Sequence, residues 1–330
     1  MRITTVSPSR LKTAKDCQFK YFLNYQWGWG DELFLYTFAS NFGTSVHNTL
    51  EEYANAKGDL DYREEFIRQL GMNNPFVEDM NSAPSKARAS FFKDKSCSTC
   101  PFFKEGGCAL RANESVDDFE GCPRELFDQG IDMIEVAIDR YGKYFETGIK
   151  SEENPTGKVI GVEAPATIVW GQGPDGEDIK MNGFIDLVIE YDEETLMVVD
   201  YKTGYSVPNM DDFISDLQPR MYSYAAKEMW PNYKYYWVQF DYFRGIPMET
   251  AFTAADDELT RKEVVGMYYD IKQATTIKRR GYDRKCKYLC NRPFCDRKWE
   301  ELKAGIDGRS DAQKEKDAKG ASQKIGEKPK

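Results

Sequence analysis

Three charged side chains stand in two apolar runs that are predicted to be neighbouring β-strands. The predicted strands span Gly183–Tyr191 and Leu196–Lys202, and an acidic turn joins them. Asp186 interrupts the first run, while Asp200 and Lys202 end the second and share one face, because side chains two apart on a strand point the same way. Charges are rarely buried unless they are paired or bind a metal. The pattern therefore indicates either a carboxylate site for a metal ion or a plain Asp–Lys ion pair.

Softer metal ligands are also present, as eight cysteines and a single histidine, His47. The sequence has no apolar run long enough to span a bilayer and no positively flanked apolar segment at Met1, so we expect a cytoplasmic protein. Cysteines in that compartment bind metals or catalyse more often than they form disulfides. One cluster, with a CxxC pair and many turn formers, contains Cys97, Cys100, Cys108 and Cys122. We predict a second metal site there, holding zinc or an iron–sulfur cluster, with unrelated reduced cysteines as the alternative.

The charge of the chain is uneven. The 330 residues carry a net charge of -10, yet residues 278–298 hold nine Lys or Arg against two Asp, a local +7 that leaves -17 elsewhere. This distribution argues against a protein that coats nucleic acid non-specifically and favours one strand-binding track, with a solvated charged face as the alternative. Tyr282, Tyr288 and Phe294 lie among these cations and could stack on bases.

Amphipathic and alternating patterns predict an α/β fold in which a mixed sheet of about five strands is flanked by helices. The predicted helices span Ser7–Gln26, Asn41–Ala56, Tyr62–Leu70, Glu125–Gly148, Asp211–Trp230 (in two pieces, the second starting near Gln218) and Asp256–Lys278, and the further strands span Lys158–Trp170, Tyr233–Arg244 and Met248–Thr253. We expect a single domain over residues 1–302, with a cysteine-rich insertion at 96–123 and a basic segment at 278–299. Residues 303–330 are predicted to be a disordered tail.

Four short motifs occur in a characteristic order: GTSVHNTLE, GFIDLV, VVDYKTG and QPRMYSY. Each motif is weak alone, but the ordered set is fairly specific. With it the chain resembles the RecB-type branch of the PD-(D/E)xK nuclease superfamily, and within it the iron–sulfur exonucleases: the CRISPR-associated single-domain exonuclease family and the nuclease domain of AddB. The resemblance runs from about Ser7 to Trp299, apart from the insertion Ser96–Pro123, and implies a restriction-endonuclease-like fold.

The resemblance implies a metal-dependent DNA exonuclease that acts on single-stranded ends, in recombination and repair, phage DNA processing or CRISPR adaptation. Lys202 would orient the attacking water or stabilise developing negative charge, and Gln218 and Tyr222 would line the site. Glu163 is expected just outside the metal ligands. The implied ligands for Mn²⁺ or Mg²⁺ are His47, Asp186, Asp200 and the backbone carbonyl of Tyr201.

The same resemblance implies a 4Fe-4S cluster that ties the two ends of the nuclease core together. Its four ligands would be Cys17, Cys286, Cys290 and Cys295. The three C-terminal cysteines are separated here by three and then four residues, whereas the family pattern has two and then five.

Two other functions remain open at this stage. The chain could be a catalytically idle module that binds DNA or a protein partner and keeps structural metal clusters, although such a module has no need for two aspartates and a lysine together. It could also be a zinc-binding interaction protein with an unrelated α/β core, in which the strand charges are ion pairs. Loss of cleavage with retained DNA binding in Asp200→Ala would separate the nuclease from the first, and metal analysis would separate it from the second.

Overall fold

A computed structural model describes residues 5–30, 38–72, 103–104, 107–108, 123–145, 157–281, 286 and 290–316. For residues 38–41, 70–72, 103–104, 107–108 and 123–127 it describes the backbone alone. Among these residues no helix is both long and apolar enough to cross a lipid bilayer.

A five-stranded mixed sheet in the order β10-β9-β8-β7-β4 forms the centre of the molecule. β8 and β9 are parallel, and the other neighbours are antiparallel. This sheet agrees with the mixed α/β fold predicted from the sequence, and it fits a restriction-endonuclease-like architecture. Its strands are β4 (Lys158–Pro165), β7 (Phe184–Glu190), β8 (Thr195–Lys202), β9 (Tyr235–Tyr242) and β10 (Met248–Thr250).

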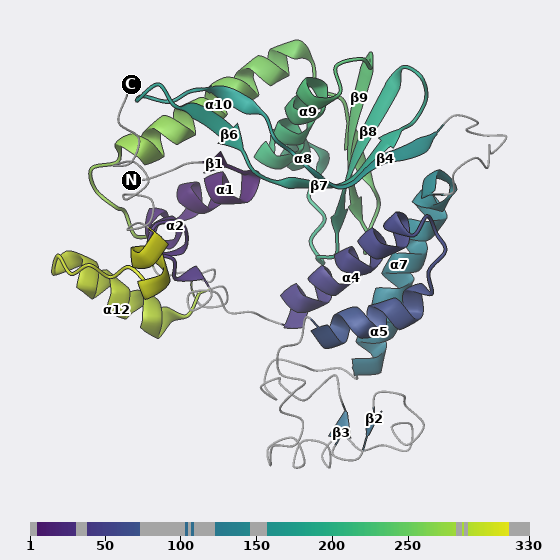
Figure 1. The fold of residues 1–330 in the computed structure, drawn as a ribbon, viewed down its shortest axis with the longest axis horizontal. Helices are drawn as coiled ribbons and strands as arrows, with labels where there is room; N and C mark the ends of the chain where they lie inside the picture. The colour runs from purple at the N-terminus through teal and green to yellow at the C-terminus, as the bar shows by residue number, and fades with distance from the viewer. Residues whose placement is uncertain are drawn as a thin grey trace, which may run out of the picture.

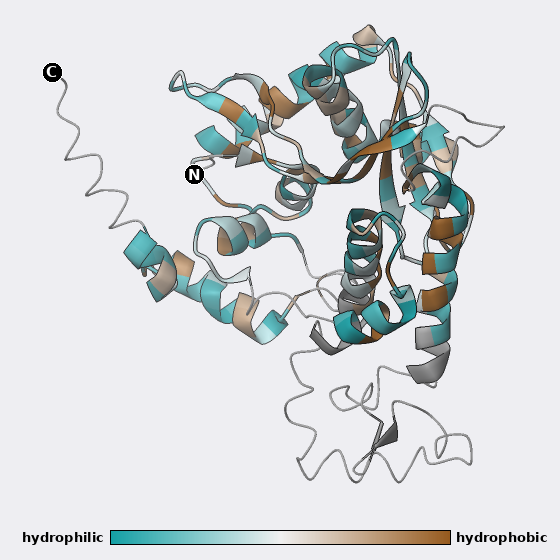
Figure 2. Cartoon of the chain, turned by 45° about the vertical axis from the view of Figure 1, so that its right-hand side comes forward, coloured by the Kyte–Doolittle hydropathy of each residue, from teal (hydrophilic) through white to brown (hydrophobic). Residues whose placement is uncertain are grey.

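Helices cover both faces of the sheet (Figure 1). Alternate residues of β8 feed two separate cores, because successive side chains of a strand point to opposite faces. Leu196 and Val198 join the core under α8 (Met210–Ser215), α9 (Leu217–Met229) and α10 (Ala254–Gln273), whereas Met197 and Val199 join the core under α4 (Phe38–Asn55), α5 (Tyr62–Met72) and α7 (Pro123–Phe145). Figure 2 shows the apolar residues gathered on the sheet and on one stripe of α7.

A second, three-stranded sheet lies beside the first and was not predicted. It has the order β1-β6-β5, from β1 (Thr5–Val6), β5 (Val169–Gln172) and β6 (Asp178–Met181). The single strand predicted over Lys158–Trp170 is therefore wrong: β4 ends at Pro165, and the chain then crosses to the second sheet. Proline has no N–H to donate to a ladder, which makes it a natural strand end.

The single helix predicted over Ser7–Gln26 is two helices, α1 (Pro8–Asp16) and α2 (Gln18–Tyr25), which meet at Cys17. Cys17 is extended, with φ of -156°. Its N–H donates to the Thr13 carbonyl at 2.9 Å, and its thiol accepts from the Lys20 N–H at 3.4 Å, so one residue caps both helices. The break turns the Cys17 thiol out of a helix face and toward the C-terminal segment.

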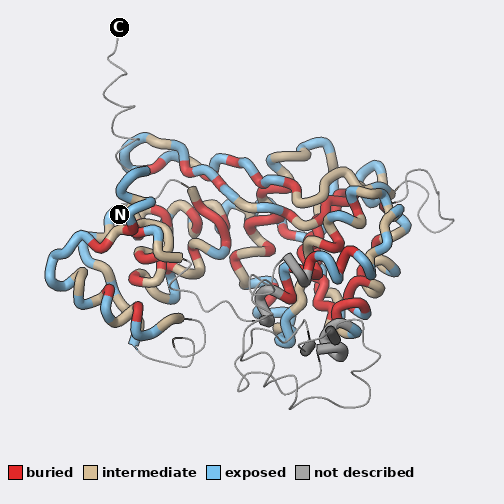
Figure 3. The backbone as a smooth tube through the Cα atoms, turned by 60° about the horizontal axis from the view of Figure 1, so that its bottom comes forward, coloured by how far each residue is buried: buried red, intermediate tan, exposed pale blue. Residues whose placement is uncertain are grey.

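The N-terminal helices and the C-terminal segment pack against each other, as predicted. Phe19, Leu23 and Trp27 of the α2 region form a third core with Phe294 of α12 (Arg292–Lys303). The Phe19 N–H also donates to the Lys278 carbonyl at 3.1 Å. This core is small, and most of α12 is exposed or half-buried (Figure 3).

Residues 303–330 were predicted to be a disordered tail, but part of the described stretch 303–316 packs against the N-terminal region. The Ser310 N–H donates to the Trp27 carbonyl at 2.9 Å, and the Trp29 indole N–H donates to the Gly308 carbonyl. Gly308 is required there because a Cβ would lie 2.4 Å from the Trp27 ring. Two tryptophans thus fix a polar segment whose composition alone suggests no packing.

Candidate active site

The two strand aspartates lie where β7 and β8 part. The last pair between these strands is Leu187 with Val199, and the next position along the ladder would be Asp186 opposite Asp200. Beyond that point the Tyr201 N–H donates to the Asp186 carboxylate at 2.7 Å. Both acids are largely buried, with side chains 12% and 6% exposed. Two carboxylates therefore enter one small volume at the end of the sheet.

His47 reaches the same place from α4. Its Nδ1 lies 3.4 Å from Asp186 Oδ2, and its ring meets the Tyr201 ring edge-on at 5.8 Å. Val46 and Leu50, on either side of His47, are buried in the core under α4 and fix the helix against the sheet. The imidazole and the Asp186 carboxylate thus converge from distant parts of the sequence.

Glu163 is closer to this centre than its predicted place outside the ligands. Ligand atoms of His47, Glu163 and Asp186 lie within 4.8 Å of one another, and among the described residues this is the one such group of three. Its neighbours pair as Val162 with Leu187 and Ala164 with Ile185, so Glu163 stands opposite Asp186. A charge inside the apolar run VIGVEAP was the signal that could have found it.

The backbone at Glu163 is strained. Its φ is +44°, a left-handed conformation that residues other than glycine adopt rarely. Such conformations cost on the order of 1–3 kcal/mol and cluster at functional sites.

The protonation energetics of the group fit a bound cation. Burial, reinforced by the charge of Asp200, raises the pKa of Asp186 well above its usual value. Burial and the nearby Asp186 raise the pKa of Glu163 to about 7. Burial lowers the pKa of His47, which favours the neutral imidazole that binds metals. Two acids that resist ionisation beside a neutral imidazole are a donor set that a divalent ion would satisfy.

Lys202, Asp200 and Gln218 form a closed triangle beside this group. Lys202 Nζ pairs with the Asp200 carboxylate and donates to Gln218 Oε1 at 3.2 Å. Gln218 Nε2 donates to Asp200 Oδ1 at 3.0 Å. Nζ also lies 4.5 Å from the centre of the Phe240 ring. The ammonium group is therefore held in one place by a charge, an amide and an aromatic face.

The start of α9 positions Gln218 and Tyr222 on one helix face. Asp216 caps the helix, accepting from the Gln218 N–H at 2.7 Å, so α9 begins at Leu217, close to the predicted start. The Tyr222 hydroxyl accepts from Gln218 Nε2 at 3.2 Å and donates to the Phe184 carbonyl at 2.9 Å. This chain of bonds ties α9 to the beginning of β7.

Asp200 lies beside the group of three ligand atoms. The prediction grouped it with His47 and Asp186 as a ligand, but its carboxylate is engaged by Lys202 and Gln218, and it is not in the group of three ligand atoms. The side chain of Tyr201, whose carbonyl was predicted as a further ligand, is buried in the core under α4. Glu163 thus complements the predicted set.

Four cysteines line one cavity of about 440 Å³ between α1, α2 and α12, namely Cys17, Cys286, Cys290 and Cys295. Burial raises the pKa of the Cys290 thiol, and it raises the pKa of Cys295 to about 11. The charge of Lys20 lowers the pKa of Cys290, and the charge of Arg279 lowers that of Cys295. Burial disfavours the thiolate, whereas the nearby cations Lys20 and Arg279 favour this form, in which cysteines bind a metal group.

The second predicted cysteine site lies outside the described residues. Cys97, Cys100 and Cys122 are not described, and Cys108 is described only as backbone in β3 (Gly107–Cys108), which pairs with β2 (Phe103–Lys104).

Part of the basic segment makes contacts within the protein. Phe294 is 8% exposed and packs on Trp29 at 5.6 Å, so its prediction as a stacking platform is wrong. Lys298 is buried against the same two rings. Arg279 and Arg292 both pair with Asp296. Tyr282 and Tyr288 lie outside the described residues. Three of the nine basic residues therefore help to hold the C-terminal segment together.

The family of the chain follows from its similarity to known proteins. A model of the PD-(D/E)XK nuclease superfamily matches residues 5–100 and 110–298. No curated protein matches the chain. The matched residues include α4, β4, β7, β8 and α9, which carry the side chains converging at the end of the sheet. Members of this superfamily cleave DNA with divalent metal ions. The chain belongs to the PD-(D/E)XK nuclease superfamily.

Proposed function

We propose that the chain is a metal-dependent exonuclease of the RecB type that hydrolyses phosphodiester bonds at single-stranded DNA ends. The observation that carries the proposal is the convergence of His47, Glu163 and Asp186 beside the Lys202–Asp200 pair. Recombination and repair, phage DNA processing and CRISPR adaptation are the settings in which such an activity would serve.

His47, Glu163 and Asp186 would hold the ion, with Asp200 next to them. The mixed nitrogen and oxygen donors suit Mn²⁺ more comfortably than Mg²⁺. When bound, such an ion lowers the pKa of a water ligand and polarises phosphoryl oxygens. The chain supplies the rest through Lys202.

Lys202 is placed to orient the attacking water or to stabilise the charge that develops on the phosphate. Its ammonium is already positioned by Asp200 and Gln218, so little reorganisation is needed at the moment of reaction. Tyr222, through its bond to the Phe184 carbonyl, keeps Gln218 in the orientation that serves Lys202.

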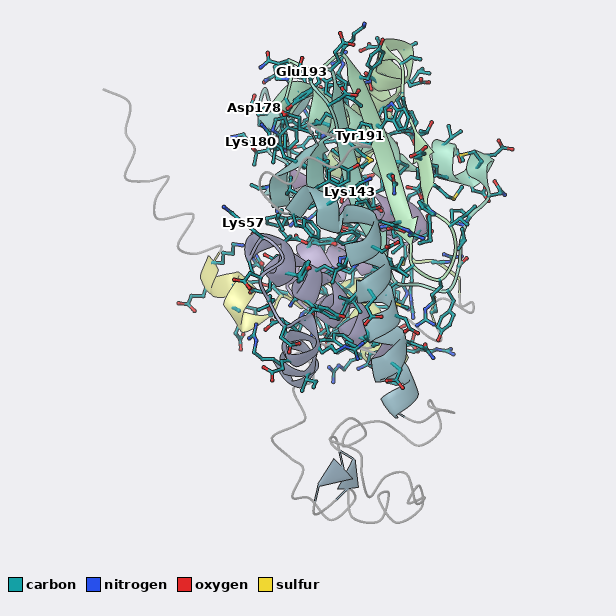
Figure 4. All side chains as sticks on the ribbon, turned by 90° about the vertical axis from the view of Figure 1, so that its right-hand side faces the viewer. Lys57, Lys143, Asp178, Lys180, Tyr191 and Glu193 are labelled. Carbon is teal, nitrogen blue, oxygen red and sulfur yellow. The ribbon has the colours of Figure 1, made fainter. Side chains whose placement is uncertain are left out.

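The decisive assay compares linear and circular single-stranded DNA with the full chain in Mn²⁺ or Mg²⁺. An exonuclease shortens an end-labelled linear strand and spares the circle. Asp200→Ala abolishes cleavage and leaves DNA binding in place. The matched control is Asp178→Ala, which changes an exposed aspartate on the β5–β6 hairpin, labelled in Figure 4. Cleavage by Asp200→Ala at the wild-type rate would overturn the proposal, and unchanged binding without any wild-type cleavage would favour the idle binding module.

We also propose that Cys17, Cys286, Cys290 and Cys295 hold a 4Fe-4S cluster. A tetrahedral zinc ion with Zn–S bonds near 2.3 Å would bring its sulfurs to about 3.8 Å of one another. Among the described residues the cysteines form no group of three within 4.8 Å, while they line a cavity large enough for a cluster. The region 1–302 would then act as one nuclease domain whose ends the cluster joins.

Anaerobic purification with iron, sulfide and zinc analysis tests the cluster. We expect about four iron and four sulfide per chain at this site, with loss of both in Cys17→Ser. The cluster would be contradicted if the wild-type chain contained one zinc ion that Cys17→Ser lacks, and no iron or sulfide.

A further inference from the structure

We propose that Tyr205 and Phe184 form a base-stacking subsite that holds unpaired nucleotides on either side of the scissile phosphate. The proposal rests on the nuclease function and specifies how that site would select single strands. It concerns two rings, one just beyond the end of β8 and one at the start of β7, on the two strands that carry the aspartates.

Tyr205 is built as an open platform. Its side chain is 75% exposed, although it follows the buried strand β8 by only three residues. The guanidinium carbon of Arg244 lies 3.7 Å from its ring centre, which is contact distance for a stacked cation–π pair. One aromatic face is thus supported by protein, which leaves the ring displayed to solvent at a fixed position.

Arg244 is itself held in place by hydrogen bonds to neutral groups. Its Nε donates to the Thr203 carbonyl at 3.1 Å, and one terminal nitrogen donates to Gln129 Oε1 at 2.9 Å. Both partners are neutral, and within the described residues no carboxylate forms an ion pair with Arg244. Because Thr203 directly follows Lys202, this positive charge stands next to the proposed catalytic centre. It is suited to a phosphate of a strand whose base lies on Tyr205.

Phe184 provides the second ring. It is 55% exposed and lies two residues before Asp186, on the same face of β7. Its carbonyl accepts from the Tyr222 hydroxyl at 2.9 Å, so its backbone is fixed by the catalytic network. This exposed ring beside a polar site offers an apolar face to a ligand.

Unpaired bases are the occupants that fit both features. A base offers an aromatic face for Tyr205 or Phe184, and the neighbouring phosphate offers a negative charge for Arg244. In a duplex both faces of an interior base are covered by its neighbours, so the rings would gain nothing there. The subsite therefore favours single strands without reading sequence.

The test measures DNA affinity in the Asp200→Ala background, which removes cleavage. We expect Tyr205→Ala to weaken binding of a single-stranded oligonucleotide by about 5- to 150-fold, the range found for loss of one stacked base, and Tyr205→Trp to retain binding. Duplex affinity should not change. The matched control is Tyr235→Ala. Tyr235 is 47% exposed, and Lys234 Nζ lies 4.9 Å from its ring centre. It stands at the first residue of β9, whereas Arg244 follows the last residue of that strand.

A second measurement varies the DNA. An oligonucleotide with abasic positions keeps its phosphates and loses its stacking faces, so it should bind more weakly than the intact strand to the Asp200→Ala protein. The two strands should bind equally well to Asp200→Ala that also carries Tyr205→Ala and Phe184→Ala. Phe184→Ala should show a similar loss with the intact strand.

The outcomes separate the two proposals. If the wild-type chain cleaves DNA but Tyr205→Ala and Phe184→Ala bind single strands as tightly as Tyr235→Ala does, the subsite is wrong and the nuclease function stands. If the wild-type chain neither cleaves nor binds single strands, both proposals fail.

Discussion

At the scale of single residues, Gln218 is the side chain on which the geometry of the site depends most. Its amide oxygen accepts from Lys202, and its amide nitrogen donates to Asp200 and to Tyr222. The orientation of the Gln218 amide is therefore fixed, and it fixes the position of the Lys202 ammonium. A residue that touches neither metal nor phosphate can thus decide where the ammonium lies.

Gln218→Ala should lower the cleavage rate by about 100-fold, because a displacement of about 1 Å in a catalytic group costs that much. The effect should fall on the rate constant and leave DNA affinity nearly unchanged, which single-turnover kinetics can show. Gln172→Ala, at an exposed glutamine bonded to Asp178, is the matched control. Equal rates for the two variants would remove Gln218 from the mechanism.

Glu163→Gln keeps the shape of the side chain and removes its charge. We expect the affinity for Mn²⁺ to fall by at least about 10-fold, as it does when groups that merely support a ligand are changed. Isothermal titration with Mn²⁺ measures this directly. Glu193→Gln, at a turn residue labelled in Figure 4, is the control. If Glu163→Gln binds Mn²⁺ as tightly as the wild-type chain does, Glu163 is not a ligand of the ion.

The residues of the site were predictable to the extent that each stood out locally. Asp186, Asp200 and Lys202 interrupt apolar strands, and Gln218 and Tyr222 are four apart on a helix. The charge of Glu163 in an apolar run is a local signal, but its place opposite Asp186 depends on the register of β4 against β7 and on a left-handed backbone. The contact between Tyr205 and Arg244 joins two distant parts of the chain, so local patterns do not predict it.

At the scale of elements, short breaks between helices do most of the positioning. Cys17 separates α1 from α2 and turns its thiol to the cysteine-lined cavity. Asp216 separates α8 from α9, caps α9, and pairs with Lys12 of α1 at 2.6 Å. Helical periodicity predicted the helices, but it could not locate the break at Cys17, since nothing in the sequence there is a helix breaker.

The β5–β6 hairpin is held to α10 by a group whose charge depends on pH. Hydrogen bonds from Lys272 and Tyr268 hold the pKa of Glu177 at about 2, below its ordinary value of 4.5. A lowered folded-state pKa means that this stabilisation is present above about pH 4.5 and is lost as the pH falls toward 2. Glu177→Gln should therefore lower the melting temperature at pH 7, and the difference from wild type should shrink between pH 4.5 and 2.5. A difference that stays constant over this range would show that the charge of Glu177 contributes nothing.

At the scale of the whole molecule, the two chain regions that end the nuclease fold are joined through a small core. Phe19 is fully buried there, and its ring meets the Trp299 ring edge-on at 4.8 Å. The sequence indicated this closure through its cysteines. It could not indicate that Phe294 and Lys298 would be buried with them, because that burial depends on Trp29.

Phe19→Ala should destabilise the protein by about 3–5 kcal/mol, the usual cost of removing a buried phenylalanine. Denaturation by urea measures this, and Ile306→Ala, at a residue 54% exposed, should cost nothing measurable. If the two variants unfold at the same urea concentration, the third core is not part of the cooperative structure.

We expect one divalent ion to join His47 to Glu163 and Asp186, and the chain allows a direct measurement of this contact. His47 is the single histidine in the sequence. Pulsed electron paramagnetic resonance of Mn²⁺ bound to the untagged full chain should show the ¹⁴N coupling of one directly bound imidazole, and His47→Gln should lose this coupling together with cleavage. An Mn²⁺ ion that supports cleavage but shows no imidazole nitrogen would contradict the account.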